Sequence, residues 1–230
     1  MLQTSISFLK ELIKNNHKEW FDAHREDYEK ARTEFNRFVD LLIAEIYRFD
    51  PTIGQLSAKD CVYRIYRDVR FSPDKTPYKN HFGAYIARGG RKSVLCGYYL
   101  HIEPASAGYL DHSMWTGGVY APDPNVLKAV RTDIYENIDE FKAIINDKDF
   151  TSTFTWFEGD KLRTAPKGFP KDFPDMELLK QKNYTFYKHI DESMLRSDRL
   201  LEESVQVFKK ILPFNQFMNR AIQYHQEQED

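Results

Sequence analysis

The chain of 230 residues is long enough to bury a sizeable core, and 41% hydrophobic with 30% charged residues is a globular composition. A net charge of −2 argues against a general nucleic-acid coat or a membrane-surface protein, so only a local patch is expected to bind a polyanion. No stretch of the sequence reaches the length of a membrane span, which argues against a helical transmembrane protein.

The N-terminal part of the chain predicts two helices. A short one is capped by Thr4 or Ser5, and a longer one runs from Lys18 to Arg48. In the longer helix the apolar residues repeat with the 3.6-residue period of a buried stripe: Phe35, Phe38, Val39, Leu42, Ile43 and Ile46. Pro51 is expected to stop it, because the residue before a proline disfavours helical geometry.

The middle of the chain predicts strands. Residues 61–71 are rich in Val, Ile and Tyr and predict a strand, and residues 72–75 have the composition of a turn with proline in its second position. Residues 82–87 and 93–103 predict two further strands, joined as a hairpin. One face of the second strand is apolar and is expected to face the core: Val94, Cys96, Tyr98, Leu100 and Ile102.

The C-terminal half mixes both kinds of element. After a short strand at residues 117–120, Asp123 and Pro124 predict a helix start, a cap followed by proline in the first turn. Beyond that helix we expect a strand over 150–157, a loop over 163–175, a short helix, a strand over 184–190 and two closing helices split at Pro213. The polar tail, residues 226–230, is expected to be frayed.

Strands clustered in the middle with helices at both ends predict an α+β fold. We expect a single domain over residues 1–230, with a mostly antiparallel central sheet and helices from both chain ends packed on it. The sequence contains no internal repeat, low-complexity linker or shift in composition at which the chain would divide.

The segment from Arg64 to Lys79 concentrates charge and aromatic rings. It holds five cationic side chains, two carboxylates, three aromatic residues and two prolines. The segment therefore carries +3 in a chain whose net charge is −2. Such a local excess indicates a concentrated positive site.

The same segment carries a family resemblance. Its pattern Arg-x-x-Arg-Asp-x-Arg-Phe, from Arg64 to Phe71, followed by Asp-Lys and Tyr, is similar to the signature of a bacterial family known as domain of unknown function 2461. Further similar stretches are Asn15–Phe21, Gly117-Gly118 and Pro166–Phe169. The resemblance covers residues 5–212 and implies membership of a family without implying an activity.

Two local geometries are open for this segment. As a strand, it presents one polar face with Arg64, Tyr66, Asp68 and Arg70, and turns the other toward the core with Ile65, Arg67, Val69 and Phe71. As a helix, it gathers on one face Arg64, Arg67, Asp68 and Phe71. Both geometries keep Arg64 beside Asp68, so we predict this ion pair, in which the carboxylate fixes the guanidinium fork.

These groups suit an anionic small molecule or a nucleic-acid phosphate. We expect Arg64 and Arg70 to contact a phosphate or carboxylate, with Asp68 orienting them. The predicted ligand-binding residues are Arg64, Arg67, Asp68, Arg70, Asp74, Lys75, Tyr78 and Lys79. The sequence leaves open whether the protein is an enzyme; if it is, Tyr78 or Lys75 is the predicted proton-transfer group.

A second interpretation makes the protein a non-catalytic protein-interaction module. Arg–Asp networks also brace a loop against a sheet edge without any ligand, and such pairs serve mainly to fix one conformation. Two roles are also possible for Trp20 and Phe21. They could form an aromatic rim that stacks a base or sugar ring, or pack into the core at a helix start.

His101 and Glu103 share one strand face, and Asp111 and His112 follow closely, so these residues could begin a metal site. We favour the alternative, a polar outer face of a hairpin. We predict no metal and no cofactor, because the sequence contains no helical metal motif, no dinucleotide fingerprint and no P-loop of correct spacing.

The two cysteines, Cys61 and Cys96, match neither a zinc motif nor a redox pair. We expect reduced core thiols in preference to a disulfide. The N-terminus shows no basic region followed by an apolar run and a small-residue cleavage site. We therefore expect a cytoplasmic protein with no membrane partner.

Overall fold

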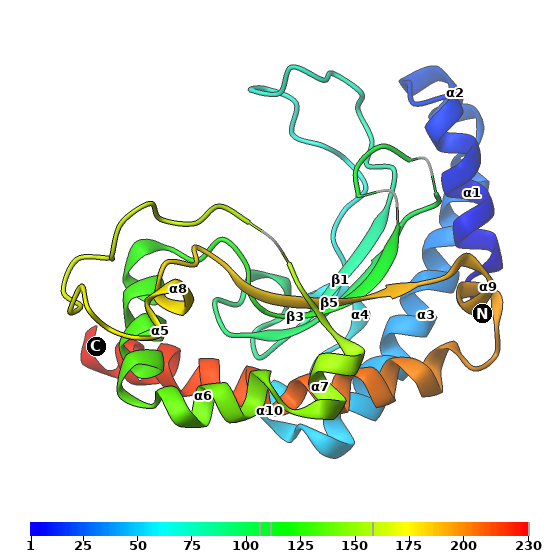
Figure 1. The fold of residues 1–230 in the computed structure, drawn as a ribbon. Coiled ribbons are helices and arrows are strands. Elements are labelled where there is room, and N and C mark those ends of the chain that lie inside the picture. The colour runs from blue at the N-terminus through cyan, green and yellow to red at the C-terminus, as the bar shows by residue number, and fades with distance from the viewer. Residues whose placement is uncertain (106, 111, 158, 230) are drawn as a thin grey trace.

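The computed structural model describes residues 1–105, 107–110, 112–157 and 159–229. Within these residues the chain forms one α+β domain, an antiparallel sheet of five strands with helices from both chain ends packed on it (Figure 1). The predicted fold class is confirmed. The strands lie in the order β1-β2-β3-β5-β4.

Alternation along the strands separates a buried face from an open one. The strands are β1 (Phe82–Ile86), β2 (Gly97–Ile102), β3 (Ser113–Val119), β4 (Thr155–Trp156) and β5 (Tyr184–Ile190). In β2, Tyr98 and Leu100 are buried as predicted, while Tyr99 points to the opposite face. Val94 departs from the prediction, because it precedes β2 and is 50% exposed.

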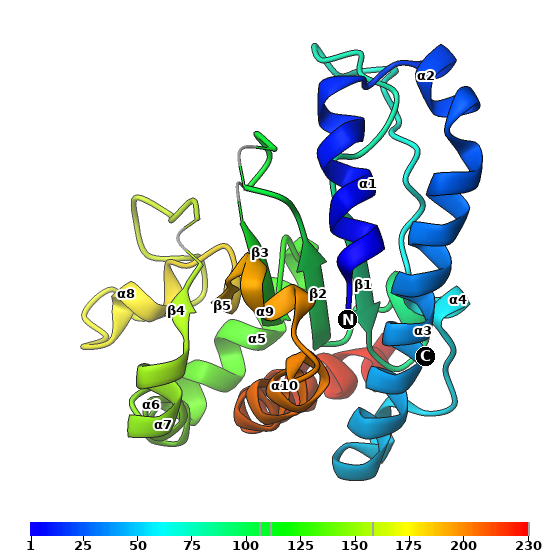
Figure 2. The ribbon, with the colours of Figure 1, turned by 90° about the vertical axis from the view of Figure 1, so that its right-hand side faces the viewer.

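The N-terminal helices are α1 (Gln3–Lys14), α2 (Lys18–Ala23), α3 (Arg25–Phe49) and α4 (Ala58–Cys61), with a 3₁₀ turn η1 (Pro51–Ile53). The helix predicted from Lys18 to Arg48 is therefore two helices. The break lies at His24, whose backbone N–H bonds the carbonyls of Trp20 and Phe21 and closes α2. The predicted stop is confirmed, since α3 ends at Phe49. Figure 2 shows α1 lying alongside α3.

The strand predicted for residues 61–71 is wrong. The segment from 62 to 81, which we call the projecting loop, pairs with strand-like geometry only at the isolated bridges Val62↔Ala84 and Tyr66↔Tyr78 (Figure 1). Phe71, expected in the core, is 94% exposed. Proline interrupts the ladder at position 77 because it has no backbone N–H to donate.

The C-terminal helices are α5 (Pro124–Glu136), α6 (Ile138–Ile145), α7 (Lys148–Thr153), α8 (Met176–Leu179), α9 (Glu192–Arg196) and α10 (Leu200–Glu229). The strand predicted for residues 150–157 is mostly wrong, because Asp147 accepts hydrogen bonds from two backbone N–H groups and caps α7 there. The predicted split at Pro213 is also wrong: α10 continues through this residue.

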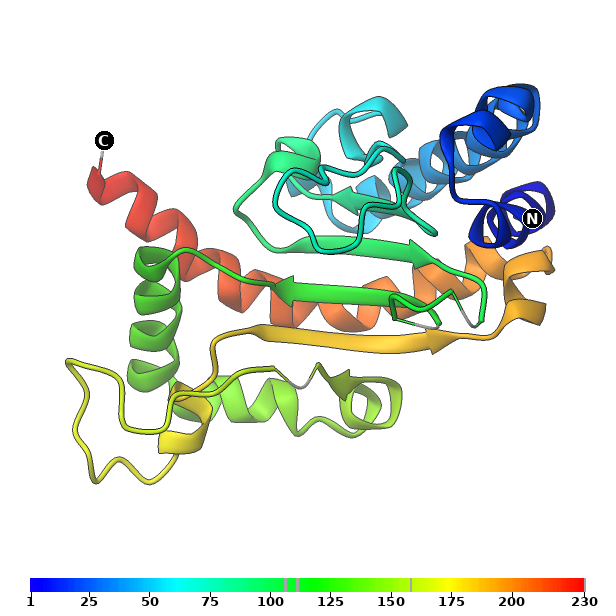
Figure 3. The ribbon, with the colours of Figure 1, turned by 90° about the horizontal axis from the view of Figure 1, so that it is seen from above.

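α10 covers one face of the sheet (Figure 3). Trp115 on β3 donates its indole N–H to Ser204 Oγ at 2.8 Å, and Phe186 on β5 meets Phe214 edge-on. A Cβ at Gly117 would lie 2.6 Å from the Ile211 side chain, so glycine permits this close approach. α10 does not cover the opposite face of the sheet. In the described part of the chain, no helix is long and apolar enough to cross a membrane.

Candidate functional site

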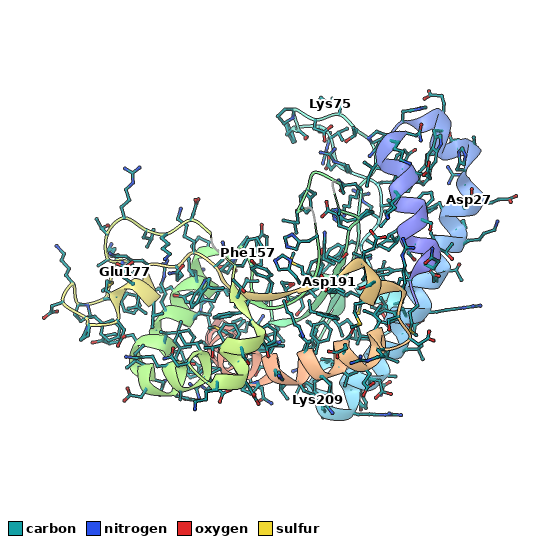
Figure 4. The ribbon with its side chains drawn as sticks, turned by 45° about the vertical axis from the view of Figure 1, so that its right-hand side comes forward. Asp27, Lys75, Phe157, Glu177, Asp191 and Lys209 are labelled. Atoms are coloured by element: carbon teal, nitrogen blue, oxygen red, sulfur yellow. The ribbon has the colours of Figure 1, made fainter. Side chains whose placement is uncertain are left out.

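A cleft of about 870 Å³ lies over the face of the sheet that α10 does not cover. Its floor is formed by side chains of four strands: Tyr85, Tyr99, Met114, Thr116 and Thr185. The projecting loop supplies one wall, and the segment leading into α5 supplies another together with Phe157. Figure 4 shows Lys75 at the outer end of the projecting loop, far from Phe157.

Aromatic side chains rim this cleft. Tyr109 is 62% exposed and Tyr120 is 67% exposed, and both line it with Tyr63 and Phe157. Tyr120 and Phe157 meet edge-on with ring centroids 6.0 Å apart. Sequence reasoning missed this rim, because the four rings come from separate segments. The only sign of such a rim in the sequence is its aromatic content of 15%.

The family-like motif near the N-terminus anchors the projecting loop. Asn16 exchanges two hydrogen bonds with the backbone of Tyr78, one donated to the carbonyl at 2.9 Å and one accepted from the N–H at 3.1 Å. The ring of Tyr78 stacks on Phe21 with centroids 3.9 Å apart. Phe21 is fully buried and Trp20 packs against the core, so neither lines the cleft.

Arg67 spans the projecting loop from side to side. Its guanidinium donates to the Asp74 carboxylate and to the hydroxyl and carbonyl of Thr76, and it reaches Ser72 Oγ at 3.4 Å. Hydrogen bonds from the Thr76 backbone N–H and then from Arg67 lower the pKa of Asp74 to about 2. Arg67 and Asp74 both line the cleft, and their contacts brace the loop.

The predicted pair of Arg64 and Asp68 is wrong. Asp68 instead accepts three hydrogen bonds from Arg70, at 2.9 Å from Nε, 2.6 Å from Nη2 and 3.3 Å from the backbone N–H. These bonds lower the pKa of Asp68. The backbone of this segment is neither strand nor helix, and Asp68 pairs with Arg70 in place of Arg64. Asp68 lines the cleft, whereas Arg64 and Arg70 do not.

Lys79 lines the cleft as a half-buried cation. Its ammonium lies 5.3 Å from the ring centroid of Tyr63, and no carboxylate in the described residues lies within ion-pair distance. Burial, followed by the charge of Arg64, lowers the pKa of Lys79. A half-buried cation without a counter-charge has lost part of its hydration, and a bound anion would offset that loss.

The two predicted proton-transfer residues lie in different places. Tyr78 lines the cleft, but its side chain is buried, and burial raises its pKa. Lys75 does not line the cleft, and its ammonium donates to the Val69 carbonyl at 2.9 Å. Of the eight predicted ligand-binding residues, the cleft brings together Arg67, Asp68, Asp74, Tyr78 and Lys79.

His101 and Glu103 do not form the polar outer face that the sequence favoured. Both side chains are 0% exposed, and His101 Nε2 lies 2.8 Å from Glu103 Oε2. Tyr99 extends the chain of contacts, its hydroxyl 3.1 Å from His101 Nδ1. Asp111 lies outside the described residues, and these include no group of three His, Cys, Asp or Glu side chains able to hold a metal.

Backbone groups hold the Glu103 carboxylate in place. It accepts hydrogen bonds from the N–H groups of Tyr109 and Leu110, each at 3.0 Å. Burial acts to raise the pKa of Glu103, but the hydrogen bonds from His101, Leu110 and Tyr109 outweigh it and the pKa lies below its usual range. Glu103 is therefore a fixed, charged acceptor beneath the cleft.

His81 lines the cleft next to this pair. Its ring is 4.5 Å from that of His101 and stacks on Tyr109 at 4.8 Å, centroid to centroid. Burial, followed by the neighbouring His101 and Lys79, lowers the pKa of His81 to about 3. The imidazole of His81 is consequently neutral near pH 7, and its Nδ1 lies 3.2 Å from Asn80 Oδ1.

A family model described as conserved hypothetical protein (DUF2461) matches residues 4–217. No curated protein and no solved structure shows a significant match to the chain. The match confirms the family resemblance that the motifs indicated, and it identifies neither a ligand nor a reaction.

Proposed function

Since this chain belongs to the DUF2461 family, whose description names no activity, we propose its function from the geometry of the cleft: it binds a small organic anion. A phosphate or carboxylate of the ligand contacts Lys79. The remainder of the ligand lies on the open face of the sheet, between the aromatic side chains of the rim.

The observation that carries this proposal is the surroundings of Lys79. Its ammonium is half-buried in the cleft wall and has no ion-pair partner within the described parts of the chain. The lowered pKa of Lys79 reflects that burial. An anion at this position would supply the missing counter-charge and gain a charge-assisted hydrogen bond.

The dimensions and lining of the cleft favour a ligand with a ring. Its volume of about 870 Å³ falls within the usual range for small-molecule sites. Tyr63, Tyr109 and Tyr120 offer flat apolar surfaces with polar hydroxyls, which suit a sugar or a base as well as an apolar ring. Sugar phosphates and nucleotides are therefore the first classes to try.

Thermal unfolding in the presence of anions tests the proposal. We expect a sugar phosphate, nucleotide or polycarboxylate to raise the melting temperature, since a ligand at a hundred times its Kd stabilises a fold by about 2.7 kcal/mol. Lys79→Gln should weaken that binding by roughly ten- to a hundredfold, the loss of a hydrogen bond to a charged group.

The matched control is Lys75→Gln, which changes a lysine of the same loop that does not line the cleft. This variant should bind the anion as the unchanged protein does. Equal losses in both variants, or no stabilisation by any anion of the panel, would contradict the proposal.

A second candidate is a non-catalytic interaction module with the Arg67–Asp74 contacts as its brace. Arg67 directs its donors to groups of its own loop, and Phe71 on that loop is 94% exposed. On this alternative Arg67→Ala lowers the melting temperature while no anion raises it. For either function we place the protein in the cytoplasm, because Cys61 and Cys96 are buried and unbridged, the state that a reducing compartment maintains.

A further inference from the structure

Three side chains at alternate positions, two on β2 and one just after it, form a continuous chain of hydrogen bonds under the cleft. Tyr99 Oη lies 3.1 Å from His101 Nδ1, and His101 Nε2 lies 2.8 Å from Glu103 Oε2. Of the three, only Tyr99 lines the cleft. The alternation of β2 places Tyr99 and His101 on the same face of the sheet.

The direction of these hydrogen bonds follows from Glu103. A carboxylate can only accept, so His101 must carry a proton on Nε2. If His101 is neutral, Nδ1 is an acceptor and the hydroxyl of Tyr99, 3.1 Å away, donates to it. The proton of the phenol thus points at a nitrogen whose other side is fixed by a buried carboxylate.

The surroundings preserve this geometry. Gly83 on β1 lies beneath the phenol, where a Cβ would be 2.6 Å from Tyr99 Oη. Two backbone N–H groups hold Glu103, which prevents the carboxylate from turning away from His101. Burial raises the pKa of Tyr99, so the phenol keeps its proton near pH 7 unless a base takes it.

We propose that Tyr99, His101 and Glu103 form a proton relay that makes Tyr99 a general base toward an anion bound in the cleft. Tyr99 Oη takes a proton from a hydroxyl group, or from a carbon next to a carbonyl, of that anion. At the same time its own proton passes to His101 Nδ1. The resulting imidazolium forms an ion pair with Glu103, and the electron pair of the broken O–H or C–H bond stays on the ligand as an alkoxide or an enolate.

This inference rests on the proposed function for its substrate, a small organic anion, but its chemistry can be measured without one. Lys79 contacts the ring of Tyr63, which in turn meets Tyr99 edge-on at 6.3 Å between centroids. An anion at Lys79 therefore lies within a small molecule's length of Tyr99.

Labelling with an aryl sulfonyl fluoride tests the relay. In this reaction Tyr99 Oη attacks sulfur, the S–F bond breaks, fluoride leaves and the phenolic proton passes to His101 Nδ1. We expect mass spectrometry to find Tyr99 labelled faster than Tyr85, which lines the same cleft but donates its hydroxyl to the Leu95 carbonyl at 2.6 Å. His101→Asn should slow the labelling of Tyr99 at least tenfold, and Tyr99→Phe should abolish it.

The exposed Tyr120 is the internal control, because its labelling rate should be the same in the His101→Asn variant as in the unchanged protein. Equal rates at Tyr99 and Tyr85, or an unchanged rate at Tyr99 in a folded His101→Asn variant, would overturn the relay. Neither labelling result would contradict the binding of an anion at Lys79, so the relay and the proposed function can fail separately.

Nitrogen-15 NMR of the unchanged protein provides a test that needs no variant to fold. The relay requires His101 to be neutral at pH 7, with its proton on Nε2 and a bare Nδ1. A proton on Nδ1, in either the other tautomer or the imidazolium, would overturn the proposal, because Nδ1 could not then accept from Tyr99.

Discussion

Two cations of the projecting loop, Arg67 and Lys79, have opposite surroundings. Arg67 meets a carboxylate, two hydroxyls and a carbonyl of its own loop, whereas Lys79 faces a tyrosine ring. The difference arises from position, because Arg67 lies across the loop from Asp74 while Lys79 follows the anchored residue Tyr78. A charge therefore indicates a site only once its partners in space are known.

His81 leads to a prediction about acid stability. Its pKa of about 3 in the folded protein lies below the ordinary value near 6.5, so the unfolded chain binds more protons between these values. The free energy of unfolding should accordingly fall as pH drops from 6.5 to 4.5, by at most about 1.4 kcal/mol per pH unit from this residue. In His81→Phe, which keeps a ring against Tyr109, that part of the pH dependence should disappear.

Urea unfolding of both proteins at several pH values between 7 and 4.5 measures this difference. Carboxylates of the unfolded chain begin to take up protons at the lower end of this range, but both proteins share them, so the difference between the two curves isolates position 81. Parallel stability curves for the two proteins would show that His81 is not the group responsible.

At the scale of elements, tertiary contacts explain why the strand predicted over residues 61–71 and the helix break predicted at Pro213 are both absent. The projecting loop lacks a strand ladder because its polar side chains bond one another and its prolines cannot donate. α10 continues past Pro213 because its buried side chains hold it against the sheet on both sides of the proline, as with Phe208 and Phe214.

Pro213 therefore costs stability that a substitution can recover. It is exposed within α10, so Pro213→Ala removes a steric conflict and adds a backbone donor without disturbing the core. We expect the free energy of unfolding to increase by about 1–3 kcal/mol, as measured by urea denaturation. Gln216→Ala, at another exposed position of the same helix, should change it by less than about 0.5 kcal/mol. If Pro213→Ala were instead less stable than the unchanged protein, the proline would be giving α10 the shape that its packing against the sheet needs.

At the scale of the whole molecule, the C-terminal helix and the sheet are joined by polar as well as apolar contacts. Asn219 donates to the Cys96 carbonyl at 3.0 Å and accepts from its N–H at 2.7 Å. Asn215 donates to the Gly97 carbonyl at 2.9 Å. These asparagines bond the backbone where β2 begins, and so hold the floor of the cleft to α10.

Asn219→Ala should destabilise the whole protein, because it leaves a donor and an acceptor of Cys96 unpaired. We expect a loss of about 1–3 kcal/mol in the free energy of unfolding, measured by urea denaturation. The same Gln216→Ala variant is the comparison, since it changes an exposed amide on α10. If the two variants lost equally little, water would be replacing the asparagine at this contact.

The sequence alone determined the features that depend on local order: the α+β class, the stripe of α3, the helix start at Asp123 and the strand over residues 184–190. Periodicity and capping are properties of neighbouring residues, so a single sequence displays them. The motif resemblance likewise singled out, from neighbouring residues alone, the segment that forms the projecting loop.

Only the tertiary structure decided which charges are paired and which face of the sheet is open. Asp68 pairs with Arg70 in a loop that has neither strand nor helix geometry, and Lys79, without an ion-pair partner in the described chain, lies over the ring of Tyr63. His101 and Glu103 became a buried pair because the segment around Leu110 covers them. These outcomes depend on the final backbone path of the loops and on α10 covering one face of the sheet, which exist only after the chain has packed together.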